Sequence, residues 1–146
     1  MEPNLKLKKD ECQSLKDAIK FRQLVGSLIY LTITRPTICY SVGVVSQFMH
    51  SSTTSHLDAA KRILRYVKGS LSQGLWYKRC AIFLLSGFTD ANWAGDSNDR
   101  RSTSGYCFST GSAVVSWCSK KQDVVALSTT EAELSQQPWL HESVIG

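Results

Sequence analysis

The spacing of apolar residues changes once along this 146-residue chain, and the change limits the folds that it can adopt. Up to Gly69 the apolar residues recur at the three- and four-residue spacing of buried helices. After Gly74 short apolar runs are separated by turn residues, a pattern typical of strands. The sequence therefore predicts an α+β fold, in which a helical segment is followed by a sheet.

Two helices are expected in the first part of the helical segment. The first begins after Asp17, and the second begins at Pro36, because proline is favoured at the first position of a helix. Residues 1–16 are polar and rich in lysine, and we expect a mobile arm there. The predicted buried residues are Leu24, Val25, Leu28, Ile29 and Leu31 in the first helix, and Val42, Val45 and Met49 in the second.

A third helix is indicated by an S-x-x-D cap formed by Ser55 and Asp58, with Gly69 after its last turn. Its expected buried face consists of Leu57, Ala60, Leu64 and Val67. The other face is basic, which suits contact with phosphate groups and is equally the pattern of a helix surface in water. The basic residues of this face are Lys61, Arg62, Arg65 and Lys68.

Strand-like runs predict an antiparallel meander in the second half of the chain. They cover residues 75–79, 82–90, 104–110 and 113–121, and a glycine-containing turn at 109–113 joins the last two. A helix is expected over residues 126–137. The predicted organisation is therefore an arm at 1–16, a helical segment at 17–80 and a sheet-containing domain at 81–146.

Charge and cysteine content restrict the setting of the protein. Lysine and arginine number 17 against 12 aspartates and glutamates, a net charge of +5 that favours a polyanionic partner such as nucleic acid. The five cysteines are odd in number and form no C-x-x-C pair, so we expect reduced thiols rather than disulfides or a zinc site. Neither a membrane span nor a signal peptide is recognisable. An intracellular protein, cytoplasmic or nuclear, is the expectation.

The stretch "GFTDANWAGD" ends an apolar run at Asp90, which is either a metal ligand or only a turn residue. Carboxylates that converge repel one another unless a cation such as Mg²⁺ or Mn²⁺ neutralises them. Ser128 and Glu131 match an S-x-x-E cap, so Glu131 has a structural role. Glu133 lies about 200° further round the helix and is the better partner for Asp90.

Four stretches resemble, in order and spacing, the C-terminal part of the Pol polyprotein of copia-type LTR retrotransposons. The likeness covers roughly residues 20–134. Its first half resembles the thumb and connection region at the end of the reverse transcriptase, and its second half the opening of the ribonuclease H domain. The stretches are "FRQLVGSLIYLTITRPTICYSVGVVSQFM", "HLDAAKRILRYVKGSLSQGLWYK", "GFTDANWAGD" and "RRSTSGYCFSTGSAVVSWCSKKQDVVALSTTEAE".

The resemblance implies a ribonuclease H fold, in which carboxylates hold two Mg²⁺ ions that promote cleavage of the RNA strand of an RNA–DNA hybrid. By motif, Asp90 matches the family's first metal ligand and Glu133 its second, which lies on a helix. After "TEAE" the chain has nothing that matches the family's remaining carboxylates. We therefore expect a truncated ribonuclease H-like domain, with an incomplete site that does not bind Mg²⁺ or Mn²⁺ tightly.

The resulting hypothesis is a remnant of a retrotransposon Pol polyprotein without independent catalysis, able to associate with itself through an unpaired strand edge. One alternative is a basic module that binds RNA–DNA hybrid or other nucleic acid without cutting it. Another is a hybrid ribonuclease that a second chain completes. The residues expected to meet nucleic acid are Lys61, Arg62, Arg65, Lys68, Arg100, Arg101, Lys120 and Lys121.

Overall fold

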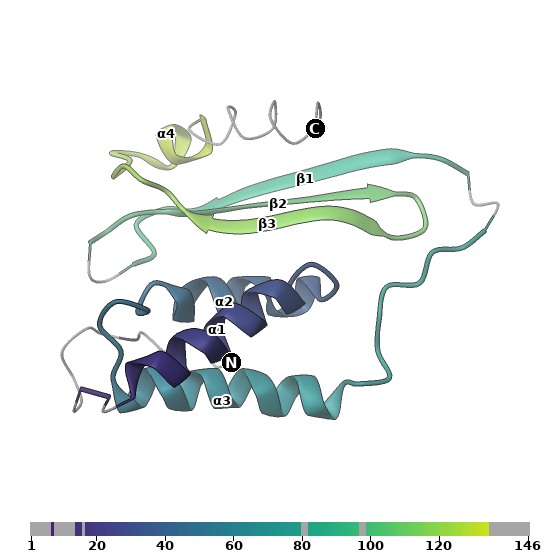
Figure 1. Cartoon of the computed structure of the whole chain (residues 1–146). Coiled ribbons are helices and arrows are strands. Elements are labelled where there is room, and N and C mark those ends of the chain that lie inside the picture. The colour runs from purple at the N-terminus through teal and green to yellow at the C-terminus, as the bar shows by residue number, and fades with distance from the viewer. Residues whose placement is uncertain (1–6, 8–13, 16, 80–81, 97–98, 135–146) are drawn as a thin grey trace. The chain divides into compact units, whose positions relative to one another are not determined.

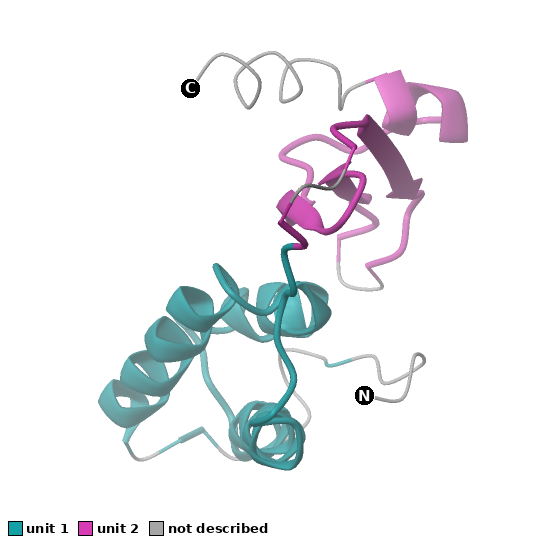
Figure 2. Ribbon diagram, turned by 90° about the vertical axis from the view of Figure 1, so that its right-hand side faces the viewer, with its two compact units in different colours: residues 1–77 teal, residues 78–146 magenta. Residues whose placement is uncertain are grey.

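Two units make up the chain in this computed structural model, residues 1–77 and residues 78–146 (Figure 2). The structure describes residues 7, 14–15, 17–79, 82–96 and 99–134. Within these residues the first unit contains helices, and the second contains a three-stranded antiparallel sheet and a short helix (Figure 1). This arrangement confirms the predicted α+β class. No helix of the described part is both long and apolar enough to cross a membrane.

Helix α1 spans Ala18–Leu31 and buries one stripe of apolar side chains. Asp17 caps it, because its Oδ1 accepts a hydrogen bond from the backbone N–H of Lys20 at 3.2 Å. Phe21 extends the predicted stripe by one turn toward the N-terminus and is fully buried. Ile29 was predicted to be buried and is 43% exposed, because the stripe that faces α2 and α3 has Val25 and Leu28 at its centre.

The second helical segment begins at Pro36, as predicted. A 3-10 turn, η1, covers Pro36–Ile38 and continues directly into α2, Cys39–Ser46. Val42 and Val45 of α2 are buried, which confirms their predicted place in the core. Cys39 forms no disulfide, and neither do Cys107 and Cys118 of the second unit. Cys12 and Cys80 lie outside the described residues.

Helix α3 spans Thr54–Gly69, and its N-cap lies two residues before Ser55, the cap residue predicted together with Asp58. Thr53 is the N-cap residue, and its backbone N–H donates to Nδ1 of His56 at 3.1 Å. The cap prediction was wrong because a histidine, rather than a carboxylate, completes the hydrogen bonds of the first turn. Leu64 was predicted to be buried and is 40% exposed, because the side of α3 that packs on the core consists of His56, Ala59, Ala60 and Ile63.

The core of the first unit lies between these helices, and it leaves the basic side of α3 in solvent. Segment 14–15 of the predicted mobile arm is attached to it, because the N–H of Leu15 donates to the carbonyl of Ser52 at 3.0 Å. Apart from Leu7, Ser14 and Leu15, the arm lies outside the described residues. The core residues are Phe21, Val25, Leu28, Ile38, Val42, Val45, Ala59, Ala60 and Ile63.

The sheet of the second unit has the order β1-β2-β3, with antiparallel neighbours. Its strands are β1 at Leu85–Asn92, β2 at Thr103–Thr110 and β3 at Val114–Lys121. Gly111 in the β2–β3 turn has a φ of +81°, a conformation that glycine adopts without a steric penalty. The meander is thus confirmed from residue 85 onward.

Residues 75–79 were predicted to be a strand, and the structure does not assign them to one. Residues 82–84 were expected to lie within β1, which begins only at Leu85. An alternating pattern becomes a strand only when a neighbouring strand supplies hydrogen bonds, and β2 pairs with β1 from Leu85 onward. The apolar run 82–84 remains solvent-exposed.

Candidate functional site

Asp90, the first candidate metal ligand, lies in the middle of β1 opposite Gly105 of β2. Its side chain is exposed, whereas the next residue, Ala91, is buried in a cluster with Ala126 and Ala132. Successive side chains of a strand point to opposite faces of the sheet. Asp90 therefore belongs to the face of β1 opposite the Ala91 contact.

Glu133, the second candidate, lies on α4, Thr129–Leu134, and is exposed. Ala132 attaches this helix to the Ala91 face of β1, and Nε2 of Gln122 donates to the carbonyl of Ala132 at 2.7 Å. The structure thus brings the helix of Glu133 against the strand of Asp90. A shared metal site stays a prediction. Residues 135–137 of the expected helix lie outside the described part.

Glu131 has the capping role that the S-x-x-E pattern predicted, with one difference. The hydroxyl of Ser128 accepts from the N–H of Glu131 at 3.2 Å. The Glu131 carboxylate accepts from the N–H of Leu127 at 2.7 Å, rather than from the N–H of the cap residue. The negative charge of Glu131 therefore stabilises the N-terminus of α4.

Two further acids of the β1–β2 loop, Asp96 and Asp99, form ion pairs with Lys121 of β3. The Nζ–Oδ1 distance to Asp99 is 2.9 Å. Partial burial raises the pKa of Asp99, but the hydrogen bond from Lys121, a backbone hydrogen bond from Arg101 and the Lys121 charge together hold that pKa below its usual value. This cluster fastens the loop to β3, and only 18% of the Lys121 side chain is exposed.

The other basic candidates of the second unit lie on its surface. Arg100 is exposed, and Arg101 is half-buried with its Nε 3.7 Å from the carboxylate of Asp99. Lys120 of β3 is exposed opposite Ser104 of β2. In the β1–β2 register Asp90 lies opposite Gly105, so none of these basic residues is its partner across the strands.

The basic face of α3 is exposed as expected. Lys61 lies 3.3 Å from the carboxylate of Asp58, one turn earlier in the same helix. Across the residues that the structure describes, Arg62, Arg65 and Lys68 have no ion-pair partner. Three positive charges on one helix are thus available to an external anion.

Two long-range hydrogen bonds that shape these regions could not be predicted from the sequence. Nε1 of Trp93 donates to the carbonyl of Ala126 at 3.0 Å and so holds the β1–β2 loop to the segment before α4. Nη1 of Arg35 donates to the carbonyl of Ser70 at 2.8 Å and so ties the start of η1 to the end of α3. Both bonds join residues more than 30 positions apart, a separation at which local patterns give no signal.

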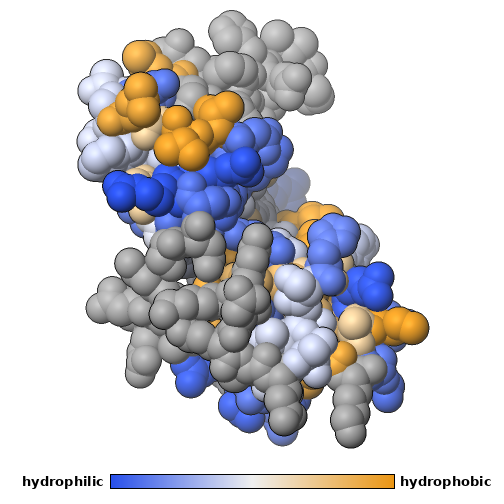
Figure 3. All heavy atoms as spheres, turned by 90° about the vertical axis from the view of Figure 1, so that its left-hand side faces the viewer, coloured by the Kyte–Doolittle hydropathy of each residue, from blue (hydrophilic) through white to orange (hydrophobic). Residues whose placement is uncertain are grey.

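Apolar side chains also gather on the surface of the second unit (Figure 3). In the segment between β3 and α4 the exposed ones are Val124, Val125 and Leu127.

Throughout the described ranges, no group of three or more His, Cys, Asp or Glu side chains lies close enough together to hold a metal ion.

Similar proteins agree with the resemblance drawn from the four stretches. The chain is 47% identical over 133 residues to the retrovirus-related Pol polyprotein from transposon RE1 of Arabidopsis thaliana, a match that covers 91% of the chain and 9% of that protein. It is 44% identical over 117 residues to an uncharacterized mitochondrial protein of the same plant, covering 80% of the chain and 49% of that protein. A protein of Plasmopara viticola named secreted RxLR effector protein 161 is 46% identical over 116 residues, which are 79% of the chain and 82% of the effector.

The chain belongs to the family of retrovirus-related Pol polyproteins from transposons. It spans less than a tenth of the RE1 polyprotein and about half of the mitochondrial relative. No protein-family model matches the chain, and no solved structure matches it.

Proposed function

We propose that this chain is the segment of a copia-type Pol polyprotein that links the end of the reverse transcriptase to the opening of a ribonuclease H-like domain, and that it does not cleave nucleic acid by itself. The observation that supports the origin is the order of the elements. A helical unit precedes an antiparallel meander, whose first strand has Asp90 and contacts the helix of Glu133. That order is what the sequence resemblance implies.

The proposed lack of independent catalysis is supported by the contacts that the acids of the second unit make. A two-cation nuclease centre needs several carboxylates that converge on the metal ions. Asp96 and Asp99 are paired with Lys121, and Glu131 caps α4. Asp90, Asp123 and Glu133 are left, and Asp90 belongs to the sheet face opposite the α4 contact. No three His, Cys, Asp or Glu side chains of the described residues lie close enough together to hold a metal ion. The described residues therefore do not fit a pair of Mg²⁺ ions.

Cleavage of a labelled RNA–DNA hybrid tests this proposal. The purified chain is incubated with hybrid and either Mg²⁺ or Mn²⁺, beside the variants Asp90→Asn and Asp123→Asn. Asp123 is an exposed aspartate of the β3–α4 segment and is the matched control. We expect no specific cleavage by any of the three proteins. Cleavage by the wild type and Asp123→Asn that is lost in Asp90→Asn would overturn the proposal.

The unpaired basic side chains of α3 favour a second candidate function, namely binding of RNA–DNA hybrid or other nucleic acid without cutting it. Arg62, Arg65 and Lys68 are exposed, and the net charge is +5. Phosphate contacts release counterions, so the affinity falls steeply as salt rises, and each contact that is lost lowers the salt slope by about one.

A salt series checks this second candidate. The affinity for a labelled hybrid is measured at low and at physiological salt, for the wild type and for Arg62→Gln/Arg65→Gln/Lys68→Gln. Arg22→Gln on α1, which is also exposed, is the control. The triple variant should bind more weakly and with a smaller salt slope. An affinity that stays flat with salt, or a triple variant that binds like the control, rules the candidate out.

A further inference from the structure

The loop that follows α3 has two large aromatic side chains on its surface. Residues 73–78 belong to neither a helix nor a strand (Figure 1). Within them Trp76 is 81% exposed and Tyr77 is 54% exposed. Tryptophan is highly buried in folded proteins on average, so a tryptophan that is mostly in solvent is informative. Its ring offers a large flat apolar surface to a partner.

Two basic residues follow these rings directly. Lys78 and Arg79 are both exposed. We call residues 76–79 the aromatic-basic segment. Because its four residues are consecutive, covalent bonds keep the rings and the positive charges together.

The charge around the aromatic-basic segment has one sign. From Asp58 to the next acid, Asp90, the sequence has no aspartate or glutamate and six basic residues. The net charge of the whole chain is +5, so this stretch alone accounts for its excess of positive charge. The six basic residues are Lys61, Arg62, Arg65 and Lys68 of α3, and Lys78 and Arg79 of the aromatic-basic segment.

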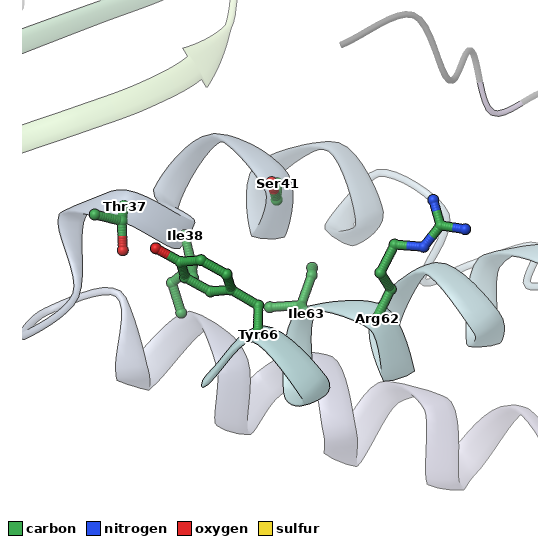
Figure 4. Close-up of a pocket in the computed structure, with 6 residues that line it drawn as sticks. All are labelled: Thr37, Ile38, Ser41, Arg62, Ile63 and Tyr66. Carbon is green, nitrogen blue, oxygen red and sulfur yellow. The ribbon is translucent and has the colours of Figure 1, made fainter. Parts of the chain in front are cut away.

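The α3 charges belong to an exposed helix surface. In Figure 4 the Arg62 side chain extends away from Thr37 and Tyr66, at the other end of the shallow hollow between α3 and the η1–α2 segment. Lys68 lies in the last turn of α3 and is exposed, a few residues before the aromatic-basic segment. The basic residues of α3 and the aromatic-basic segment thus follow one another along the chain.

Exposed rings beside positive charges suit a single-stranded nucleic acid. The bases of a single strand present their flat faces, which stack on aromatic side chains, while the phosphates contact lysine and arginine. In a duplex those faces are already stacked on neighbouring bases, and only the base edges are accessible. A duplex would therefore use the charges of this segment and leave the ring of Trp76 without a role.

We propose that the aromatic-basic segment binds a single-stranded nucleic acid, in which Trp76 stacks on a base and Lys78 and Arg79 contact phosphates. The inference rests on the proposed nucleic-acid-binding function and deepens it. It names the form of nucleic acid and adds a base contact to the phosphate contacts of α3. Stacking is tolerant of sequence, so no particular base is required.

Affinities for two labelled strands test the stacking contact. One is an oligothymidylate of about 12 nucleotides, a length within the range that single-strand sites cover, and the other is the same phosphodiester strand without bases. The variants are Trp76→Leu, which removes the aromatic ring, and Trp76→Phe, which keeps one. Leu71→Ala, at a 70% exposed apolar position of the same loop, is the control.

Trp76→Leu should weaken binding of the oligothymidylate about ten-fold, within the range measured for the loss of one stacking ring. The same variant should bind the strand without bases like the wild type. Trp76→Phe and Leu71→Ala should retain binding to within about three-fold. Circular dichroism should be the same for all variants, because the substituted side chains are exposed.

The phosphate contacts are tested by the salt dependence of the same binding. Lys78→Gln/Arg79→Gln should weaken the binding of both strands. Its salt slope should be smaller by about 1.4, because each phosphate contact to a single strand contributes about 0.7. An unchanged slope overturns the assignment of these two residues.

The outcomes separate this inference from the function on which it rests. If the oligothymidylate binds and Trp76→Leu binds it like Leu71→Ala, the segment proposal fails and the basic module stands. If the chain binds neither strand and no hybrid, both fail. If Trp76→Leu is selectively weakened while the α3 triple variant binds hybrid like its control, the segment proposal stands and the basic face of α3 is not the site.

Discussion

His56 is a fully buried polar side chain whose hydrogen bonds fix the start of α3. Its ring stacks on Phe48 with centroids 3.9 Å apart. Its Nδ1 accepts the backbone N–H of Thr53 and lies 3.0 Å from the Thr53 hydroxyl. Because this nitrogen is an acceptor, the imidazole is neutral with its proton on Nε2. A buried ring thus contributes packing and also satisfies an otherwise unpaired amide.

Replacing His56 by alanine should therefore destabilise the first unit. The change removes the stacked ring, leaves a cavity and leaves the backbone N–H of Thr53 without its acceptor, for a loss of about 2–4 kcal/mol in the free energy of unfolding. Urea denaturation followed by helical circular dichroism measures it. His50→Ala at an exposed position is the control and should change stability by less than about 0.5 kcal/mol. Equal effects of the two substitutions would contradict this role.

The Asp99–Lys121 ion pair should make the free energy of unfolding decrease as the pH is lowered. The pKa of Asp99 is lowered in the folded protein. Its stabilising contribution is therefore complete above the unfolded pKa of about 3.9 and is lost as the pH falls through the folded pKa. The stability difference between the wild type and Asp99→Asn should shrink as the pH is lowered from 6 to about 3. Denaturation across that range measures it. A stability difference for Asp99→Asn that stays constant across this pH range refutes the assignment.

Helix α4 is attached to β1 through small side chains. Ala91, Ala126 and Ala132 form the buried cluster, and Ala132 is completely inaccessible. Small residues allow the backbone of the helix to approach the strand closely. The hydrogen bonds of Trp93 to Ala126 and of Gln122 to Ala132 then satisfy carbonyls at this contact. The position of Glu133 thus depends on alanine packing.

Ala132→Leu should weaken this attachment, because three additional carbons have no space at a fully buried position. We expect a loss of about 1–3 kcal/mol, with faster hydrogen exchange in 126–134 than elsewhere in the second unit. Thr130→Leu is exposed on the same helix and should leave exchange unchanged. If Ala132→Leu is tolerated like Thr130→Leu, the helix is not held by this contact.

The features that local patterns could predict are those that depend on neighbours in sequence. Alternation predicted β2 and β3, and helical spacing predicted the Val25 and Leu28 stripe of α1. The start of α3 depends on where His56 meets Phe48, and the start of β1 depends on pairing with β2. From the sequence, Glu133 could be preferred to Glu131 as the candidate metal ligand, because Glu131 matches the capping pattern. The sheet face of Asp90 became known only from the Ala91–Ala132 contact.

The second unit exposes an unusual amount of apolar surface for its size. Phe88 of β1 is 71% exposed, and residues 82–85 add four further exposed apolar side chains. In the part of the chain that the structure describes, β1 is an edge strand, because it pairs with β2 on one side only. Edges of this kind template pairing with another chain.

We therefore propose self-association through β1. The mass in solution should rise with concentration in sedimentation experiments, and Phe88→Lys should shift the protein toward monomer, because a charge on an edge strand opposes pairing. Tyr40→Lys, at an exposed aromatic position of α2, is the control and should associate like the wild type. A wild type that is monomeric at every concentration would disprove this role of the edge.

We propose that this Pol segment builds no two-cation centre by itself, and calorimetric titration with Mn²⁺ examines this point. Wild type and Asp90→Asn are each titrated at a pH near 7. We expect small, non-saturating heats that are the same for both proteins, because Asp96, Asp99 and Glu131 are held in other contacts. Saturable binding of two ions per chain that disappears in Asp90→Asn would contradict it.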